Sequence, residues 1–413
     1  MSRVDPVSQQ SAVTGRWLSI VGIGEDGVGA LSPVARGLIG DAEIVFGGKR
    51  HLALAAGLIR GAARPWTSPF DGSTDAVLAH RGKQVCVLAS GDPFVYGVGA
   101  VLARHIDPSE TLVLPAPSAF SLAAARLGWA LPETAQVSLH GRALDLVRPH
   151  LQPGMRVLAL TSDRDGPAAL ARLLSDSGFG ASSLIVLEAL GGRQERIRAT
   201  TAAQFALREI HDLNVVAIEA KAGPGARVIA RVAGLPDAMF EHDGQITKRE
   251  IRAVTLSSLA PRRGEALWDI GAGSGSVAIE WLLADPSLQA VAIERRPDRA
   301  ARIRRNAAAF GVPGLEVIEG EAPEVLESLP SPDAIFIGGG AEETLDAAGA
   351  VLRVGGRLVV NAVTLETEAL LLARHATLGG ELTRLAITRA DAVGAKTGWR
   401  PALPVTQWTW IKP

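Results

Sequence analysis

The stretch Leu267-Trp-Asp-Ile-Gly-Ala-Gly-Ser-Gly-Ser-Val-Ala-Ile-Glu280 decides the fold of the C-terminal half of the chain. It predicts a strand, a turn with glycines at alternate positions, and then a helix. Glycine lets the backbone turn tightly and approach a ligand closely, and a helix start offers free N–H groups. The spacing lacks the later glycine of a dinucleotide fingerprint, which disfavours an NAD-dependent dehydrogenase. Asp269 precedes the first glycine, where a carboxylate suits a cationic amino-acid group and repels a pyrophosphate.

The next three predicted strands end in further candidate ligand contacts. The strand Gln289–Glu294 ends in a carboxylate about twenty residues after the glycine turn, where an acid accepts hydrogen bonds from ribose hydroxyls. The third strand runs into Glu319-Gly-Glu-Ala-Pro323, which we expect at the edge of an adenine ring. The fourth ends in Gly338-Gly-Gly340, near the place where a methyl group would be transferred.

In this order, the motifs resemble those of the class I S-adenosylmethionine-dependent methyltransferases, a Rossmann-like fold, over residues 245–413. The resemblance implies S-adenosyl-L-methionine as cofactor. The implied cofactor contacts are Asp269, Gly271, Gly273, Gly275, Glu294, Glu321 and Ala322. The Asn-Pro-Pro-Tyr motif that the family places in N-methyltransferases is absent after Ile337, which weakens a nucleic-acid or protein N-methyltransferase interpretation. A Rossmann-like domain in which Asp269 and Glu294 only end strands is the alternative.

Three pieces of the N-terminal half form a second pattern. They are Ile20-Val-Gly-Ile-Gly-Glu-Asp-Gly27, Leu88-Ala-Ser-Gly-Asp-Pro-Phe-Val-Tyr-Gly97 and Ala116-Pro-Ser-Ala-Phe120. In order, they resemble the tetrapyrrole methylases, or class III methyltransferases, over residues 17–235. That family folds as two α/β subdomains, here about 17–115 and 116–235, with the cofactor in the cleft between them.

The residues of this half that match the tetrapyrrole methylase cofactor-binding stretches are Gly91, Asp92, Tyr96, Ser118 and Ala119, with Gly22 and Gly24 in the loop at the substrate side. Many family members have Gly-x-Gly-Pro-Gly in that first loop, whereas this chain has Gly22-Ile-Gly-Glu-Asp-Gly27. Ordinary turns between strands and helices would explain any single piece, but not all three in sequence.

Short apolar runs bounded by turns alternate with helix-like stretches along the whole chain, which predicts α/β architecture with parallel sheets. The runs are Leu18–Ile23, Val85–Ala89, Val157–Leu160, Leu184–Leu187, Val215–Ile218, Ala266–Ile270, Gln289–Ile293, Leu315–Ile318, Ala334–Ile337 and Arg357–Val360. Pro404–Ile411 alternates and is expected to be a final strand at a sheet edge. We place a flexible tail at 1–16 and a linker at 236–244.

A tetrapyrrole methylase followed by this class I domain is similar to the bifunctional decarboxylating methyltransferases of cobalamin biosynthesis. The resemblance implies methylation of a precorrin-6 type tetrapyrrole at C5 and C15 and decarboxylation of its C12 acetate, with C15 and the decarboxylation assigned to the C-terminal half. Orientation and electrostatics would supply most of the catalysis. No metal is expected, because the eight histidines are scattered.

The many carboxylates of such a substrate call for Arg or Lys in both pockets. The candidates are Lys49, Arg50, Lys248, Arg249 and Arg252. Around Lys248, Arg249 and Arg252, the sequence also predicts a helix for structural reasons. Thr247 and Glu250 have capping-box spacing, and an apolar face is predicted at Ile251, Val254 and Leu259.

Composition limits the remaining functions. A net charge of −1 argues against a nucleic-acid binder that relies on a large positive field. The first sixteen residues contain no apolar signal-peptide region and no apolar run reaches membrane-spanning length. Cys86 lies in an apolar strand and is expected to be structural. We expect a cytoplasmic homo-oligomer that binds a small-molecule tetrapyrrole, with no nucleic acid and no membrane. Another bifunctional methyltransferase and a non-catalytic S-adenosylmethionine sensor are the alternatives.

Overall fold

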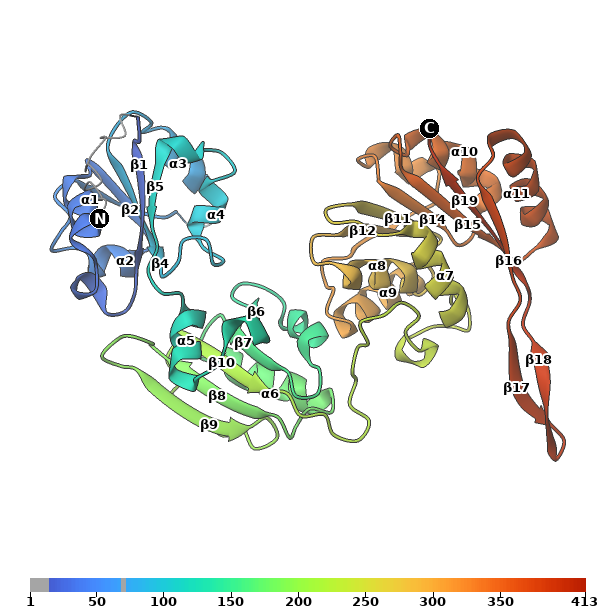
Figure 1. The fold of residues 1–413 in the computed structure, drawn as a ribbon, viewed down its shortest axis with the longest axis horizontal. Helices are drawn as coiled ribbons and strands as arrows, with labels where there is room; N and C mark the ends of the chain where they lie inside the picture. Colours follow the sequence, from blue (N-terminus) through green and yellow to red (C-terminus); the bar gives the residue numbers. More distant parts are fainter. Residues whose placement is uncertain (1–14, 68–71) are drawn as a thin grey trace, which may run out of the picture. The chain divides into compact units, whose positions relative to one another are not determined.

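The computed structural model describes residues 15–67 and 72–413, so the predicted tail lies outside it up to residue 14. The chain divides into two compact units. The first comprises Met1–Arg142 and Pro153–Ala226, and the second comprises Ala143–Gln152 and Arg227–Pro413. Figure 1 draws both units. None of the helices in the described ranges has the length and hydropathy needed to cross a membrane.

The first unit opens with a five-stranded sheet in the order β3-β2-β4-β1-β5, in which every pair of neighbours is parallel. Its strands are β1 (Leu18–Ile23), β2 (Ile44–Gly47), β3 (Ala62–Pro65), β4 (Val85–Ser90) and β5 (Thr111–Leu114). The connecting helices are α1 (Pro33–Asp41), α2 (Lys49–Leu54), α3 (Ser73–Leu78) and α4 (Val98–Leu102). The inner strands β1 and β4 are apolar on both faces because separate hydrophobic clusters cover the two sides.

A second five-stranded sheet of the first unit, in the order β6-β7-β10-β8-β9, is mostly antiparallel. Its strands are β6 (Thr134–Ser138), β7 (Arg156–Leu160), β8 (Ser183–Glu188), β9 (Arg196–Thr201) and β10 (Asn214–Glu219). It is accompanied by α5 (Ala119–Leu127) and α6 (Gly166–Asp176). The expectation of parallel sheets throughout is therefore wrong here, because short apolar runs look alike in either direction.

The second unit is built on a seven-stranded sheet in the order β13-β12-β11-β14-β15-β19-β16. Its strands are β11 (Ala266–Ile270), β12 (Gln289–Glu294), β13 (Glu316–Glu319), β14 (Ala334–Ile337), β15 (Arg357–Ala362), β16 (Glu381–Leu385) and β19 (Val405–Ile411). The first five are parallel, and β19 is antiparallel to both of its neighbours. The strand order reverses between β11 and β14, and ligands of open α/β sheets bind at such a point.

Helices cover both faces of this sheet, and the two sides bury separate clusters. The helices are α7 (Arg249–Leu259), α8 (Ser276–Ala284), α9 (Pro297–Ala309), α10 (Ala341–Val351) and α11 (Leu365–Leu378). Leu267 and Trp268 show the alternation, because adjacent residues of β11 belong to opposite clusters. A central strand buried on both faces accounts for the continuous apolar run in the sequence.

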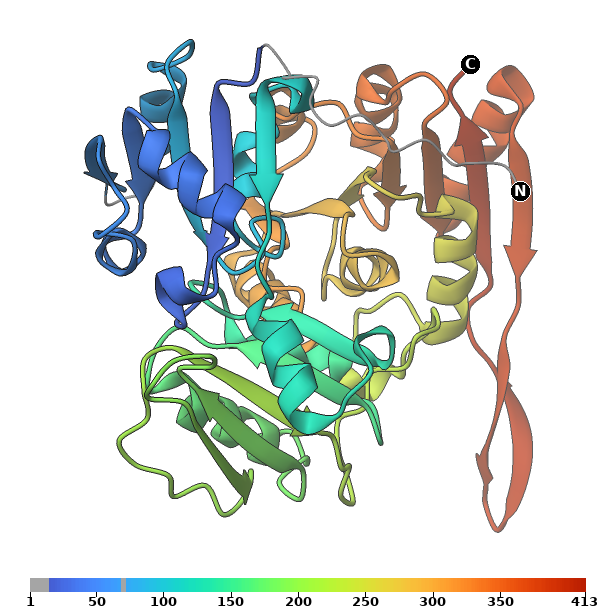
Figure 2. The same ribbon diagram turned by 60° about the vertical axis from the view of Figure 1, so that its left-hand side comes forward.

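A two-stranded hairpin, β17 (Thr388–Val393) and β18 (Lys396–Pro401), is inserted between β16 and β19. Figure 1 and Figure 2 show it running beyond the seven-stranded sheet. The insertion returns the chain as β19 between β15 and β16, so the predicted edge position of Pro404–Ile411 is wrong. Trp408 is consequently core, 1% exposed, whereas Trp399 on the hairpin is 76% exposed.

All ten predicted apolar runs lie in strands, with β13 beginning one residue later than expected. The structural interpretation of Cys86 is also confirmed: the side chain is fully buried in β4, and burial raises the pKa of its thiol to about 12. A thiol in that state is neither ionised nor accessible at neutral pH.

Candidate active sites

The glycine turn of the second unit joins the end of β11 to the start of α8. Gly271, Gly273 and Gly275 all have positive φ, at 70°, 60° and 73°, a region that residues with a side chain seldom adopt. A Cβ atom at Gly275 would lie 2.7 Å from the side chain of Ile303 on α9. One at Gly271 would lie 3.0 Å from the carbonyl oxygen of Gly339, after β14. The alternating glycines therefore allow both the turn and the close approach of its neighbours.

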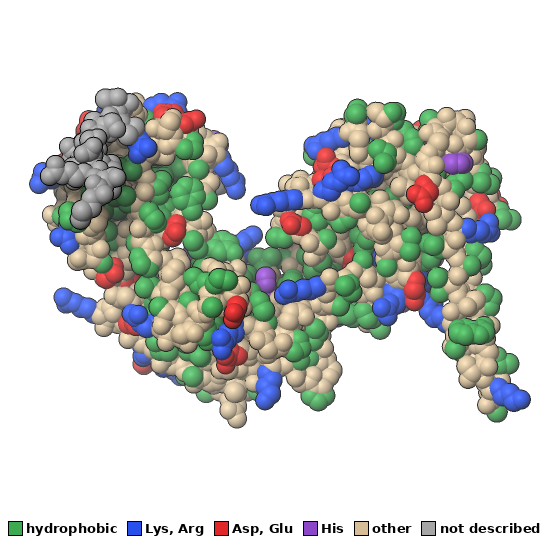
Figure 3. All heavy atoms as spheres, in the orientation of Figure 1, with side chains coloured by type: hydrophobic (Ala, Val, Ile, Leu, Met, Phe, Trp, Pro, Cys, Tyr) green, Lys and Arg blue, Asp and Glu red, His purple; other side chains and the backbone are tan. Residues whose placement is uncertain are grey.

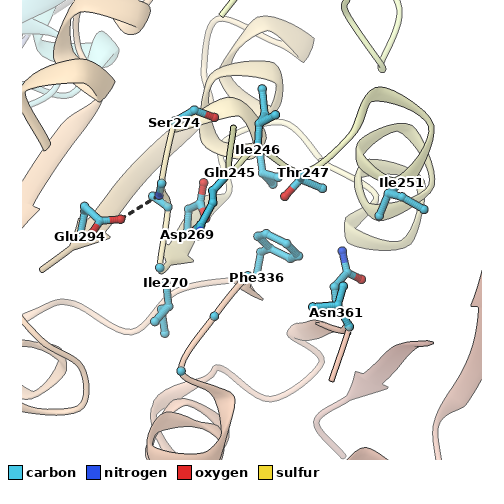
Figure 4. A pocket seen from close by; sticks show the side chains of 18 of the residues that line it. Gln245, Ile246, Thr247, Ile251, Asp269, Ile270, Ser274, Glu294, Phe336 and Asn361 are labelled. Carbon is cyan, nitrogen blue, oxygen red and sulfur yellow. Dashed lines mark hydrogen bonds between the residues drawn. The ribbon is translucent and has the colours of Figure 1, made fainter. Parts of the chain in front are cut away.

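A cavity of about 910 Å³ opens at this turn, near the upper end of the range for small-molecule sites. It is lined by the carboxyl ends of β11, β12, β14 and β15, by the segment 244–251 apart from Arg249, and by the base of the β17–β18 hairpin. Figure 4 shows Asp269 and Glu294 on one side of it and Ile251 and Asn361 on the other, with Phe336 between them. The cavity lies where the strand order reverses.

Asp269 carries an unusual carboxylate. The side chain is 1% exposed; Oδ2 accepts a hydrogen bond from the Ala278 amide at 3.0 Å, whereas Oδ1 is buried without a partner. Burial raises the pKa of Asp269 to about 7, and the charge of Glu294 adds to the rise. A buried, unpaired carboxylate oxygen lining a cavity fits a cationic ligand group such as an ammonium.

The other predicted cofactor contacts of this unit line the same cavity, except Gly275 at the start of α8. Glu294 is 4% exposed and accepts from the amides of Gly273 at 2.9 Å and Arg296 at 3.0 Å, so it both shapes the turn and keeps acceptor sites free. Glu321 and Ala322 lie beyond β13, where Glu321 pairs with Arg295 at 3.3 Å. These carboxylates fit an adenosine that carries an amino-acid tail.

The three basic candidates around α7 have different surroundings. Lys248 lines the cavity, and no ion pair of its ammonium occurs among the described residues. Arg249 is exposed and outside the lining. Arg252 is fully buried: its guanidinium contacts Glu280 at 2.6 Å and Asp237 at 3.2 Å and stacks on the Phe240 ring at 4.7 Å.

The predicted substrate role of Arg252 does not fit this burial, because no N–H group of its side chain is turned to the cavity. The predicted capping box is also wrong. Lys248 is the N-cap of α7, without a side-chain cap, and the carbonyl of Thr247 accepts from Arg252 instead. The amphipathic pattern of a helix does not show whether a cation on it, such as Arg252, forms an ion pair inside the core.

Arg389 and Asn361 are among the lining residues that were not predicted from the sequence. Arg389 comes from the hairpin base and pairs with Glu250 of α7. Asn361 ends β15. Neither sits in a glycine-rich motif, and no local signal in the sequence marks them. The hairpin has no apolar run, and a strand-end asparagine is common in loops.

In the first unit, the three predicted pieces meet. A Cβ atom at Gly22 would lie 1.9 Å from the carbonyl oxygen of Gly91 and 2.6 Å from the amide nitrogen of Ala116. Gly91 has φ +57°, and a Cβ there would lie 2.8 Å from the Pro117 carbonyl oxygen. Ser118 caps α5 by accepting from the amide of Ser121 at 3.1 Å. The backbones are packed so closely that only glycine fits at the first two positions.

The other candidates of this unit surround that junction. Asp92 Oδ1 accepts from the amide of Phe94 at 2.8 Å. Tyr96 has φ +54°, is 56% exposed, and donates from its hydroxyl to the Gln136 carbonyl at 3.1 Å. Ala119 is the first residue of α5, and Gly24 follows β1. A strained, exposed tyrosine beside a glycine junction is typical of a ligand site.

Of the two basic candidates in this unit, Arg50 is the better placed. It forms an ion pair with Glu25, which follows β1, and donates to Ser90 at the end of β4 at 3.2 Å. Burial lowers the pKa of the neighbouring His51 to about 4, and the charge of Arg50 adds to this, so the imidazole is neutral. Lys49 is the first residue of α2 and is exposed.

Comparisons with known proteins cover both units. The tetrapyrrole (corrin/porphyrin) methylases match residues 18–206, and the precorrin methyltransferase domain matches residues 238–412. A Sinorhizobium protein named precorrin-6Y C(5,15)-methyltransferase [decarboxylating] is 60% identical over 99% of both chains. The chain belongs to the precorrin-6Y C(5,15)-methyltransferase family. Membership confirms the predicted fold class and the prediction of a decarboxylating methyltransferase.

Other relatives of the family differ in extent. A Mycobacterium tuberculosis protein of the same name is 41% identical over 95% of this chain and 99% of its own. A Saccharolobus solfataricus protein named probable cobalt-precorrin-6B C(15)-methyltransferase (decarboxylating) is 41% identical over 33% of this chain and 72% of its own. Precorrin-6Y C(5,15)-methyltransferase relatives thus match the whole chain, and a shorter relative matches a part of it.

Proposed function

We propose that this chain methylates a precorrin-6Y type tetrapyrrole at C5 and C15 and removes the carboxyl group of its C12 acetate as carbon dioxide, with S-adenosyl-L-methionine as cofactor. The observation that supports this most directly is the second unit's cavity. Its lining combines the buried carboxylates Asp269 and Glu294 with Asn361, which lies across the cavity from them, and with the cations Lys248 and Arg389. The carboxylates suit a cationic cofactor group, and the cations and the amide suit an anionic substrate.

The residues of the cavity would bind and orient rather than react. Asp269 Oδ1 would accept from the ammonium of the cofactor's amino-acid tail, and the free acceptor sites of Glu294 would take ribose hydroxyls. Bound there, the cofactor supplies an electrophilic methyl group. Phe336 and Ile251, both buried, give the cavity apolar walls that exclude water. The enamine-like ring carbon needs no base to attack, so catalysis rests on position and electrostatics.

We further propose that the second unit methylates C15 and removes the carboxyl group, while the first methylates C5. The shorter Saccharolobus solfataricus relative, which is named for C15 methylation and decarboxylation alone, matches 33% of this chain, which supports a division of the two methylations between separate parts of it. In the first unit, Gly22, Gly91, Tyr96 and Ser118 would hold a second cofactor. Arg50 would face a substrate carboxylate after leaving Glu25.

We also propose that the protein works in the cytoplasm as a homo-oligomer on a small molecule, without nucleic acid. The face in Figure 3 carries basic and acidic side chains interspersed, rather than a field of one sign. Light scattering of the purified protein tests the oligomer, and a DNA and RNA binding titration tests the absence of nucleic-acid affinity.

The direct test of the proposed function supplies the full-length protein with S-adenosylmethionine and precorrin-6Y and measures product masses. The expected product has gained two methyl groups and lost one carbon dioxide. Cofactor binding without any mass change would favour the sensor alternative. Methylation of another substrate class would favour a different bifunctional methyltransferase.

A further inference from the structure

Asn361 is held in one orientation by a buried polar network below the cavity. It lies at the end of β15, opposite Gln407 of β19. Gln407 Nε2 donates to Asn361 Oδ1 at 2.9 Å and lies 3.1 Å from Thr255 Oγ1. Asn361 Nδ2 donates to the same Thr255 hydroxyl oxygen at 3.0 Å. Ser258 Oγ donates to Gln407 Oε1 at 2.8 Å.

Donor and acceptor counts fix the direction of both amides. If the amides of Asn361 and Gln407 were reversed together, two oxygens would face Thr255, whose hydroxyl has one hydrogen to give. If one amide alone were reversed, two NH₂ groups or two oxygens would meet. Only the observed arrangement satisfies every contact, and Thr255 and Gln407, at 0% and 1% exposure, have no water to compensate for a mismatch.

This arrangement leaves Asn361 with one N–H group and one acceptor site unused. No side chain in the described ranges takes that second N–H, and the residue lines the cavity. Figure 4 places it away from Asp269 and Glu294 and on the side of Ile251. Asn361 and its unused N–H group therefore lie on the side of the cavity away from the proposed cofactor contacts Asp269 and Glu294.

Asn361 differs from Lys248 and Arg389, two cations that also line the cavity. Lys248 is exposed, and Arg389 is 49% exposed and paired with Glu250, so both suit carboxylates that keep their charge throughout the reaction. Asn361 is neutral and half-buried, and it shares the cavity lining with the apolar Ile251, Phe336 and Val405. Such surroundings orient a carboxylate without stabilising its charge strongly, which favours conversion to neutral carbon dioxide.

We propose that Asn361 is a positioning residue for decarboxylation: its unused N–H donates to the C12 acetate carboxylate of the substrate, in an orientation set by Gln407 and Thr255. In that step the bond between the acetate methylene and its carboxyl carbon breaks. Its electron pair enters the conjugated ring, carbon dioxide leaves, and the methylene later takes a proton from water. The inference rests on the proposed function and deepens it.

The test measures, for full-length variants, the ratio of carbon dioxide lost to methyl groups added. Asn361→Leu removes the donor at similar volume, and Gln407→Met removes the group that orients it. Both are expected to lower the ratio at least about tenfold, because the carboxylate loses the contact that aligns its breaking bond with the conjugated ring, while methylation continues. Gln245→Leu, an amide on another part of the cavity lining, is the matched control and should keep the wild-type ratio even if its rate falls.

A wild-type ratio in both folded variants would overturn the inference, as would an equal fall in methylation and decarboxylation. If the apolar variants fail to fold, Asn361→Asp decides, because it keeps the shape and an acceptor for Gln407 but repels a carboxylate. A loss of decarboxylation alone is again the expected result. Wild-type protein that binds cofactor and converts no corrin refutes the proposed function itself, whereas wild-type turnover with unchanged variant ratios refutes only the role of Asn361.

Discussion

At the scale of single residues, Asp269 is the most informative group, because its charge depends on what is bound. Its folded pKa of about 7 lies above the ordinary value of 3.8. The folded, cofactor-free protein therefore holds a proton that the unfolded chain releases. The contribution of this group to the free energy of unfolding is complete below about pH 4 and is lost as the pH rises to about 7, a change on the order of 4 kcal/mol.

A cationic ligand beside Asp269 should abolish this loss of unfolding free energy at higher pH. We expect the rise in melting temperature produced by S-adenosylmethionine to be larger at about pH 7.5 than at about pH 6, because the ion pair needs the ionised carboxylate. Asp269→Asn should give a smaller rise that is equal at both pH values. Thermal melting with and without cofactor measures this, and an equal rise in the wild type would contradict the assignment.

Lys248 and Arg249 form a natural matched pair, since they are adjacent cations and only Lys248 lines the cavity. Lys248→Glu should raise the KM for the tetrapyrrole about 10- to 100-fold, the effect of losing a charge-assisted contact. Arg249→Glu should change it less than about twofold. Steady-state kinetics of the C15 step distinguish them, and equal effects would mean that general surface charge, rather than a contact in the cavity, attracts the substrate.

At the scale of elements, Arg252 anchors the segment before α7 to α8. Its partners Glu280 and Asp237 lie on different elements, and Glu280 also accepts the amides of Gly234 and Leu235 at 2.7 and 2.9 Å. Removal of the guanidinium would leave a buried carboxylate unpaired. Arg252 is therefore a structural residue that holds the cavity-lining segment in place.

Arg252→Ala should cost about 3–5 kcal/mol of unfolding free energy in the second unit, the usual effect of breaking a buried pair. Arg353→Ala breaks a pair with Asp333 in which the arginine is 54% exposed, and should cost less than about 1 kcal/mol. Chemical denaturation followed by tryptophan fluorescence compares them. Equal losses would show that the Arg252 network contributes no more than a surface pair.

Elements also show where prediction from sequence succeeds. The glycine turns at Gly271 and Gly91 were predictable because positive φ and close backbone approach are local demands that glycine alone meets. The interior position of β19 was not predictable, because it depends on β16, which pairs with the outer edge of β19 and whose sequence has no continuous apolar run. Arg389 was missed because it pairs with Glu250, which is far away in the sequence. Arg252 was misplaced because its burial depends on Glu280, which belongs to another helix.

At the scale of the whole molecule, the proposed function requires two separate methyltransferase sites on one chain. The two units have different sheets and different glycine junctions, and the two matched families cover separate ranges. Each site should therefore lose its own product when altered alone. Glu294→Ala alters the second site, and Gly91→Ala alters the first by placing a Cβ 2.8 Å from the Pro117 carbonyl oxygen.

The product masses of these two full-length variants with S-adenosylmethionine and precorrin-6Y are the most direct test of whether the two units carry separate sites. We predict that Glu294→Ala adds one methyl group, at C5, whereas Gly91→Ala adds one methyl group, at C15, and still loses carbon dioxide. Unchanged melting of the unaltered unit is the control for folding. If either substitution abolished both methylations in a folded protein, or if decarboxylation failed with Gly91→Ala alone, the division of the reaction between two sites would be wrong.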